Sequence, residues 1–156
     1  MARPLCGISL VLLLSVLVFA SANLIQFGWI IKHVTGRQAL IYNGYGCYCG
    51  WGGSRQPVDD TDWCCQVHDC CYGALSLRQC KPKIEKYSYS TEEDTVTCGG
   101  ETECQRETCE CDKAAALCFR RSAFQNRYIA YPDFLCLGTA PPCEGVRRRS
   151  APTKWG

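Results

Sequence analysis

The sequence predicts a mainly α-helical, disulfide-rich domain, in which an N-terminal helix and two long antiparallel, disulfide-linked helices carry a small β-wing. Three observations predict this fold class: an apolar leader, a high density of cysteines after it, and apolar or cysteine residues repeated at helical spacing. The chain has 156 residues and 15 cysteines. This length fits one domain, and the cysteine content is typical of disulfide scaffolds.

Residues 1–22 have the features of a secretory signal peptide. Arg3 provides a basic start, residues 10–19 form an apolar run, and the small-residue cleavage site Ala-Ser-Ala ends at Ala22. The apolar run is too short to span a bilayer comfortably, which disfavours a membrane anchor. Cleavage after Ala22 begins the mature chain at Asn23, so we expect a secreted, extracellular protein.

Loss of the leader removes Cys6 and leaves 14 of the 15 cysteines, in 134 of the 156 residues. An even number of cysteines in an oxidising compartment favours disulfides. The alternative is a zinc site at Cys64 and Cys65 or at Cys109 and Cys111, which the same compartment disfavours.

The net charge of +2 argues against nucleic-acid binding, for which a strongly basic chain is expected. Basic residues concentrate in residues 144–156, where Arg147, Arg148, Arg149 and Lys154 accompany a single acid. This basic C-terminal tail has three interpretations: a disordered terminus, a site of proteolytic trimming, or a weak contact with anionic lipid or heparan sulfate.

Three segments have helical character. Residues 24–34 carry an apolar stripe at i, i+3 and i+7. Residues 60–77 open with acids that suit a helix N-terminus, and residues 102–119 follow two glycines and contain three consecutive alanines. Between the last two, residues 83–97 alternate Tyr with Ser and predict an exposed β-hairpin. From residue 122 onward we expect irregular chain held by cysteines.

Cysteine spacing relates the two long helices. Cys64 and Cys71 are seven residues apart, as are Cys111 and Cys118, and seven residues make two helical turns, so each pair shares a face. Antiparallel helices can therefore be linked twice, Cys64 to Cys118 and Cys71 to Cys111. In both pairs the two residue numbers add up to the same value, which is what antiparallel helices in one registry require. Spacing alone does not establish this connectivity.

His68 lies between these two links, and Asp112 lies within one turn of the position opposite it. Tyr72, four residues after His68, shares its face. A histidine, a tyrosine and a carboxylate would thus meet between rigid helices, where the acid can fix the imidazole tautomer and stabilise its protonated form. The other histidine after the leader, His33, is interpreted as a surface or helix-terminus residue.

A glycine-rich loop at residues 45–53 precedes these helices and contains four glycines and two cysteines. Glycine allows backbone carbonyls to turn inward, and carbonyl oxygens together with one carboxylate suit Ca²⁺. Asp69, next to His68, would supply that carboxylate. A tight, disulfide-braced turn without metal is the alternative.

The chain resembles the secreted phospholipase A2 family in three motifs: YGCYCGWGG at 45–53, CCQVHDCCY at 64–72 and CECDKAAALC at 109–118. The resemblance runs over residues 23–143, which would form the catalytic domain, and is most similar to group II, group IIE in particular. It implies calcium-dependent hydrolysis of the sn-2 ester of glycerophospholipids at a membrane surface. The sequence leaves the oligomeric state open, and since the fold needs no partner, we expect a monomer.

The resemblance also implies a role for each site residue. His68 would be the general base that takes a proton from the attacking water, and Asp112 would orient it. Around this pair the resemblance implies Tyr72 and Tyr87 as hydrogen-bond donors to Asp112, the backbone oxygens of Tyr48, Gly50 and Gly52 with the carboxylate of Asp69 as Ca²⁺ ligands, and Leu24, Phe27 and Ile31 as the lining of an acyl channel.

Seven disulfides follow from the same resemblance: Cys47–Cys136, Cys49–Cys65, Cys64–Cys118, Cys70–Cys143, Cys71–Cys111, Cys80–Cys104 and Cys98–Cys109. Trp29 and Trp51 are candidates for a lipid-facing rim, since Trp favours membrane interfaces; burial in the core is the alternative for both.

A non-catalytic receptor-binding or matrix protein on the same scaffold is the alternative function. Relatives of that kind lose the metal-binding acid or the base. Here His68, Asp69 and Asp112 are all present, which favours the enzyme. The tail at 144–156 is the main departure from the group II pattern.

Overall fold

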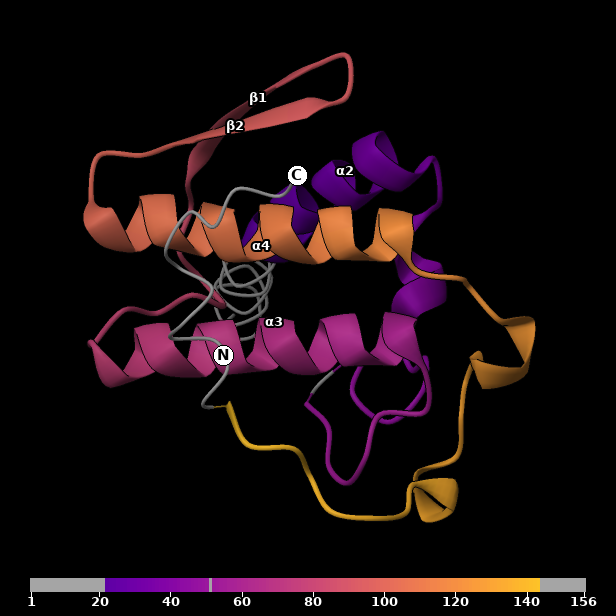
Figure 1. Ribbon diagram of the computed structural model, residues 1–156. Coiled ribbons are helices and arrows are strands. Elements are labelled where there is room, and N and C mark those ends of the chain that lie inside the picture. Colours follow the sequence, from indigo (N-terminus) through magenta and orange to yellow (C-terminus); the bar gives the residue numbers. More distant parts are fainter. Residues whose placement is uncertain (1–21, 51, 144–156) are drawn as a thin grey trace, which may run out of the picture.

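The computed structural model describes residues 22–50 and 52–143. The predicted signal peptide up to residue 21, the basic tail at 144–156 and Trp51 lie outside the described residues. Within them the chain forms three α-helices, one two-stranded sheet and three short 3-10 helices (Figure 1). None of the described helices is both long and apolar enough to cross a membrane.

The three predicted α-helices are all present: α2 (Ala22–Thr35), α3 (Asp60–Leu77) and α4 (Glu103–Arg121). Each of the last two begins at a side-chain cap, which accepts a hydrogen bond from an otherwise unpaired amide. Asp59 caps α3 by accepting from the Asp62 N–H at 2.9 Å. Thr102 caps α4 with a capping box, which explains why that helix begins at residue 103 and not at 102.

Helices α3 and α4 lie side by side and antiparallel (Figure 1). Two disulfides join them, Cys64–Cys118 and Cys71–Cys111, with Cα–Cα distances of 5.7 and 5.9 Å. These are the two links that the cysteine spacing predicts. The other five disulfides are the expected pairs Cys47–Cys136, Cys49–Cys65, Cys70–Cys143, Cys80–Cys104 and Cys98–Cys109.

The β-wing is formed by β1 (Ser88–Glu92) and β2 (Thr95–Gly99), antiparallel, with Ser88 opposite Gly99. It therefore begins later than the predicted hairpin at 83–97. The reason is that the backbone just before β1 bonds to side chains of α2 and not to another strand. The side-chain NH₂ groups of Asn23 and Gln26 donate to the backbone carbonyls of Glu85 and Tyr87, at 2.9 and 2.6 Å respectively.

Helix α2 packs against α4, and the core lies between them and the loop that follows α2. Ile30 and Tyr45 are fully buried there, and Phe119 stacks on Tyr42 at 4.3 Å between ring centroids. After α4 the chain runs as irregular segments, as expected, along the side of α3 that faces away from α4 (Figure 1). The three 3-10 helices are η1 (Ala39–Tyr42), η2 (Asn126–Tyr128) and η3 (Asp133–Leu135).

Candidate active site

A histidine and an aspartate meet between α3 and α4, midway between the two disulfides that join these helices. The Nε2 atom of His68 lies 2.7 Å from Oδ1 of Asp112. Asp112 is completely buried, whereas the His68 side chain keeps 13% of its surface exposed. The antiparallel registry predicts this convergence, because both residues occupy the facing sides of the linked helices.

Two tyrosines complete the surroundings of the Asp112 carboxylate. The Tyr72 hydroxyl donates to Oδ1 at 2.7 Å, and the Tyr87 hydroxyl donates to Oδ2 at 2.6 Å. Burial, followed by the charge of Asp112, raises the pKa of both phenols well above their usual range. Both tyrosines therefore stay protonated and act only as donors, which stabilises the carboxylate in its buried position.

This arrangement determines what the His68 ring can do. The contact to Asp112 assigns the ring proton to Nε2, which leaves Nδ1 as a proton acceptor. The ring itself is held between two others: Phe27 stacks on it at 4.6 Å between centroids, and Tyr72 lies at 4.3 Å. A fixed imidazole whose Nδ1 is left as the acceptor nitrogen has the geometry of a general base.

Asp69 follows His68 on α3 and borders a cleft of about 610 Å³ together with Gly52 and Gly53. Burial raises the pKa of Asp69, an effect that the neighbouring His68 and, less strongly, Lys83 oppose. In the same loop as Gly52, which borders this cleft, Gly50 has a φ angle of +141° and Gly52 one of +106°, values that side-chain-bearing residues rarely adopt. The loop thus orients its peptide groups in a way that only glycine permits.

These residues fit a hard cation. Within residues 22–50 and 52–143, no group of three or more His, Cys, Asp or Glu side chains could hold a metal ion. A cation beside Asp69 therefore needs backbone oxygens, which the glycine-rich loop offers. One carboxylate with several carbonyl oxygens is a donor set suited to Ca²⁺.

Comparison with known proteins identifies the family. A family model described as phospholipase A2 matches residues 24–129. The chain belongs to the phospholipase A2 family. Its relatives include the group IIE secretory phospholipases A2 of Mus musculus, 57% identical over 80% of this chain and 89% of the relative, and of Homo sapiens, 55% identical over 86% and 96%. The basic phospholipase A2 myotoxin I of Bothrops asper is 52% identical over 81% and 93%.

Family membership accounts for the seven disulfides and the arrangement of three helices with one small sheet. The protein is accordingly a secreted homologue of the phospholipases A2, an ester hydrolase class, and its buried His68–Asp112 pair is intact. The predicted channel residues take three different positions in this fold. Phe27 covers the His68 ring, Ile31 is buried in the core, and Leu24 is 50% exposed.

Sequence reasoning missed two buried polar residues near the site. Asn23 is completely buried, and its side-chain oxygen lies 3.1 Å from the Tyr72 hydroxyl. Asp62 is also completely buried and binds three backbone amides around the glycine-rich loop. Asp62 stands among acids that the sequence explains as a helix N-terminus, so nothing local distinguished it from its exposed neighbour Asp60.

Proposed function

We propose that this protein hydrolyses the sn-2 ester of glycerophospholipids, with Ca²⁺ as cofactor, to a free fatty acid and a lysophospholipid. The observation that carries this proposal is the His68–Asp112 contact next to Asp69 and the glycine-rich loop. A histidine base beside a carboxylate and a loop suited to a hard cation is the combination that ester hydrolysis by an activated water requires.

His68 takes a proton from the attacking water at Nδ1, while Asp112 stabilises the imidazolium that forms. The water oxygen bonds to the ester carbon, and the ester carbon–oxygen bond then breaks. The proton held by His68 passes to the departing alkoxide, which leaves as the lysophospholipid hydroxyl. Tyr72 and Tyr87 keep Asp112 oriented through this cycle.

The calcium site is proposed at the carbonyl oxygens of Tyr48, Gly50 and Gly52 and the carboxylate of Asp69. When bound, Ca²⁺ supplies Lewis-acid polarisation of the ester carbonyl and charge for the developing oxyanion. The Gly50 N–H is proposed as a second donor to that oxyanion. Donors of this kind contribute about 3 kcal/mol each to lowering the barrier.

Membrane contact is proposed for the exposed side of α2. Leu24, Ile25 and Trp29 are 50, 54 and 63% exposed there, although large apolar side chains favour burial. Trp in particular favours a lipid–water interface.

We propose in addition that the signal peptide at 1–22 is removed and that the tail at 144–156 binds anionic lipid or heparan sulfate.

The alternative is a non-catalytic receptor-binding or matrix protein on the same scaffold. The intact His68–Asp112 contact and the presence of Asp69 favour the enzyme over this alternative. We expect calcium-dependent release of fatty acid from phosphatidylcholine vesicles, abolished by His68→Gln while the variant still binds calcium. Calcium binding by the unchanged protein without any fatty-acid release would favour the alternative and contradict the proposed activity.

A further inference from the structure

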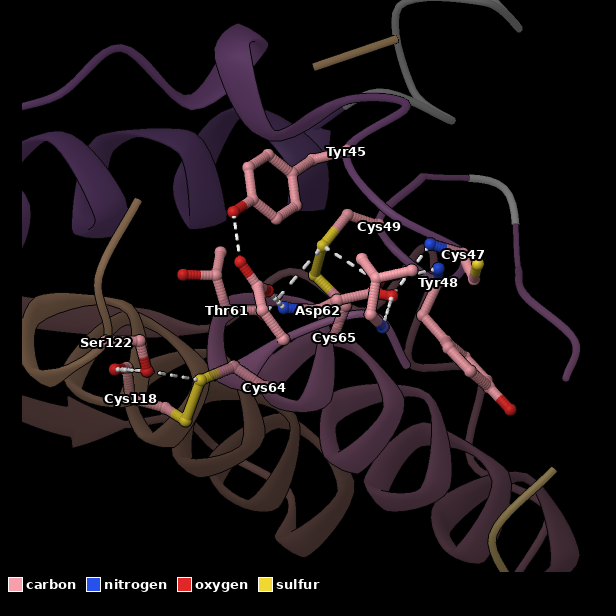
Figure 2. Close-up of a disulfide and its surroundings, with 12 residues drawn as sticks. Tyr45, Cys47, Tyr48, Cys49, Thr61, Asp62, Cys64, Cys65, Cys118 and Ser122 are labelled. Carbon is pink, nitrogen blue, oxygen red and sulfur yellow. Dashed lines mark hydrogen bonds between the residues drawn. A yellow bond between two sulfur atoms is a disulfide. The ribbon is translucent and has the colours of Figure 1, made fainter. Parts of the chain in front are cut away.

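Asp62 ties the first half of the glycine-rich loop, and the segment that follows the loop, to helix α3. Its Oδ2 atom accepts from the amides of Cys47 and Val58 at 2.8 and 2.9 Å, and its Oδ1 accepts from the Tyr48 amide at 2.8 Å. Figure 2 shows Asp62 directed from α3 toward the backbone of Cys47 and Tyr48. One carboxylate thus orients two consecutive peptide groups within the loop and one in the segment between the loop and α3.

The carboxylate is itself fixed on a rigid support. Asp62 occupies the first turn of α3, and its own N–H donates to the capping residue Asp59 at 2.9 Å. Gly46 approaches so closely that an added Cβ would lie 2.3 Å from the Asp62 carboxyl carbon, and its φ is +60°. The backbone can wrap the carboxylate this tightly only because residue 46 has no side chain.

This support extends to the peptide group whose carbonyl is a proposed calcium ligand. The Tyr48 carbonyl belongs to the same peptide group as the Cys49 N–H, which donates to the Tyr45 carbonyl at 3.2 Å. Since a trans peptide points its N–H and C=O in opposite directions, the Tyr48 oxygen faces away from Tyr45. The Tyr48 hydroxyl also donates to the Arg55 carbonyl at 2.5 Å, so Tyr48 is held at both its backbone and its ring.

We propose that Asp62 is a positioning residue for calcium: by holding the backbone up to the Tyr48 amide, it presets the part of the loop that carries the Tyr48 carbonyl before the ion binds, without touching the ion. The inference rests on the proposed calcium-dependent function. The disulfides Cys47–Cys136 and Cys49–Cys65 anchor the loop at its cysteines, but a disulfide leaves rotation of the neighbouring peptide groups free. Hydrogen bonds to Asp62 remove that rotation.

Only a carboxylate satisfies all three partners, because each partner is an N–H donor and an ionised carboxylate accepts through both oxygens. In Asp62→Asn one oxygen becomes an NH₂ group that opposes at least one amide donor. We expect the variant to bind Ca²⁺ at least about 10-fold more weakly, in the range seen when residues that orient metal ligands are changed. Calorimetric titration of the purified protein with CaCl₂ measures this directly.

Asp60→Asn is the matched control. Asp60 lies two residues away on the same helix, is exposed, and loses the same charge in this substitution. We expect the dissociation constant for calcium to change by a much smaller factor in this control than in Asp62→Asn. Equal effects in the two variants would overturn the proposal, since they would show that net charge alone attracts the ion.

A purely structural role for Asp62 predicts a different pattern. It would lower the unfolding temperature of Asp62→Asn but leave calcium affinity of the folded variant unchanged, and that result would overturn the proposal. If Asp62→Asn does not fold, Gly46→Ala tests the same contact, because it keeps the carboxylate but pushes it off the amides. Gly46→Ala is expected to weaken calcium binding as well, and unchanged affinity would contradict the proposal.

Amide hydrogen exchange tests the presetting in the unchanged protein. Without calcium, the amides of Cys47, Tyr48 and Val58 are expected to exchange slowly, because all three are bonded to Asp62. Rapid exchange that slows only after calcium is added would overturn the proposal. Absence of calcium binding by the unchanged protein would instead overturn the calcium site itself, and this inference with it.

Discussion

At the scale of single residues, the site depends on polar groups whose partners are few and fully enclosed. Asp112 has no exposed surface, and its described partners are His68 and two tyrosines. A buried charge that loses a donor is not compensated by water, so the loss costs more than an ordinary hydrogen bond contributes. The two oxygens of Asp112 differ in how many described donors each one has: Oδ1 has His68 and Tyr72, and Oδ2 has Tyr87.

Tyr87→Phe is expected to destabilise the protein more than Tyr72→Phe. Among the described residues, Tyr87 is the donor to Oδ2, whereas Oδ1 keeps His68 when Tyr72 is changed. We expect a loss of about 1–3 kcal/mol in unfolding free energy for Tyr87→Phe and a smaller loss for Tyr72→Phe. Denaturant unfolding with the disulfides intact measures both, and a larger loss for Tyr72→Phe would contradict this reading of the two oxygens.

Two threonines of the α4 region are expected to respond in opposite directions to the same substitution. Thr108 is completely buried, and its hydroxyl is the buried side-chain polar atom without a hydrogen-bond partner in the part of the chain that the structure describes. Thr108→Val should stabilise the protein by about 1 kcal/mol, because an unpaired buried hydroxyl is replaced by a methyl group.

Thr102→Val is the comparison for this prediction. The Thr102 hydroxyl accepts from the Gln105 amide at 3.2 Å and caps α4, so its loss should destabilise the protein by about 1 kcal/mol. Thermal unfolding of the two variants measures both changes: the unfolding temperature should rise for Thr108→Val and fall for Thr102→Val. Destabilisation by both would mean that Thr108 has a partner after all.

At the scale of elements, α3 carries most of the proposed chemistry. Its first turn anchors the glycine-rich loop through Asp62, and its middle presents His68 and Asp69 on successive positions. Because successive helical residues point about 100° apart, these neighbours face different surroundings. His68 faces α4 and Asp112, and Asp69 faces the cleft that Gly52 borders.

Two glycines that border this cleft are expected to differ when changed to alanine. Neither would bring an added Cβ within 4 Å of another atom, so only the backbone distinguishes them. Gly73 lies inside α3, and Gly73→Ala should stabilise the protein by about 1 kcal/mol. Gly52 has a φ of +106°, so Gly52→Ala should strain the loop.

The readouts for this pair are unfolding free energy and calcium affinity. Gly52→Ala is expected to weaken calcium binding, because the strain is relieved by turning its peptide groups. Gly73→Ala should leave calcium affinity as it is. Tighter calcium binding by Gly52→Ala would show that its backbone conformation is not needed for the site.

At the scale of the whole molecule, the disulfides link α3 and α4 to each other and to other segments, whereas α2, the third described α-helix, is held by packing and by polar side chains. Asn23 and Gln26 connect α2 to the chain before β1, and Phe27 connects it to the His68 ring. The proposed membrane contact therefore falls on an α-helix that packing and side-chain hydrogen bonds, and no described disulfide, hold to the long helices.

Deletion of residues 144–156 tests the proposed role of the basic tail. The tail carries four basic residues and one acid, and each cation near an anionic membrane contributes about 1 kcal/mol. The deletion should weaken binding to anionic vesicles at low salt and leave binding to zwitterionic vesicles unchanged. Salt-insensitive binding that is equal with and without the tail would remove the lipid contact.

Much of this architecture could be predicted because it depends on spacing within single elements. The start of α3 is indicated by acids that suit a helix N-terminus. Helical periodicity and antiparallel registry make the links Cys64 to Cys118 and Cys71 to Cys111 possible, and with that registry Asp112 falls within one turn of the position opposite His68. The β-wing was predicted too early in the chain, since its start depends on side chains of α2 that lie about sixty residues away.

By itself, therefore, the sequence determined which segments are α-helical, and its cysteine spacing indicated a registry for two of them that brings a histidine and an aspartate to facing sides. These properties are local or follow from two short spacings. Only the tertiary structure decided that Asp62 holds the glycine-rich loop, that Asn23 reaches Tyr72, and that Leu24 is half exposed. Each of these depends on which distant segment meets the residue, and the buried environment that results is set by the packing of the whole chain.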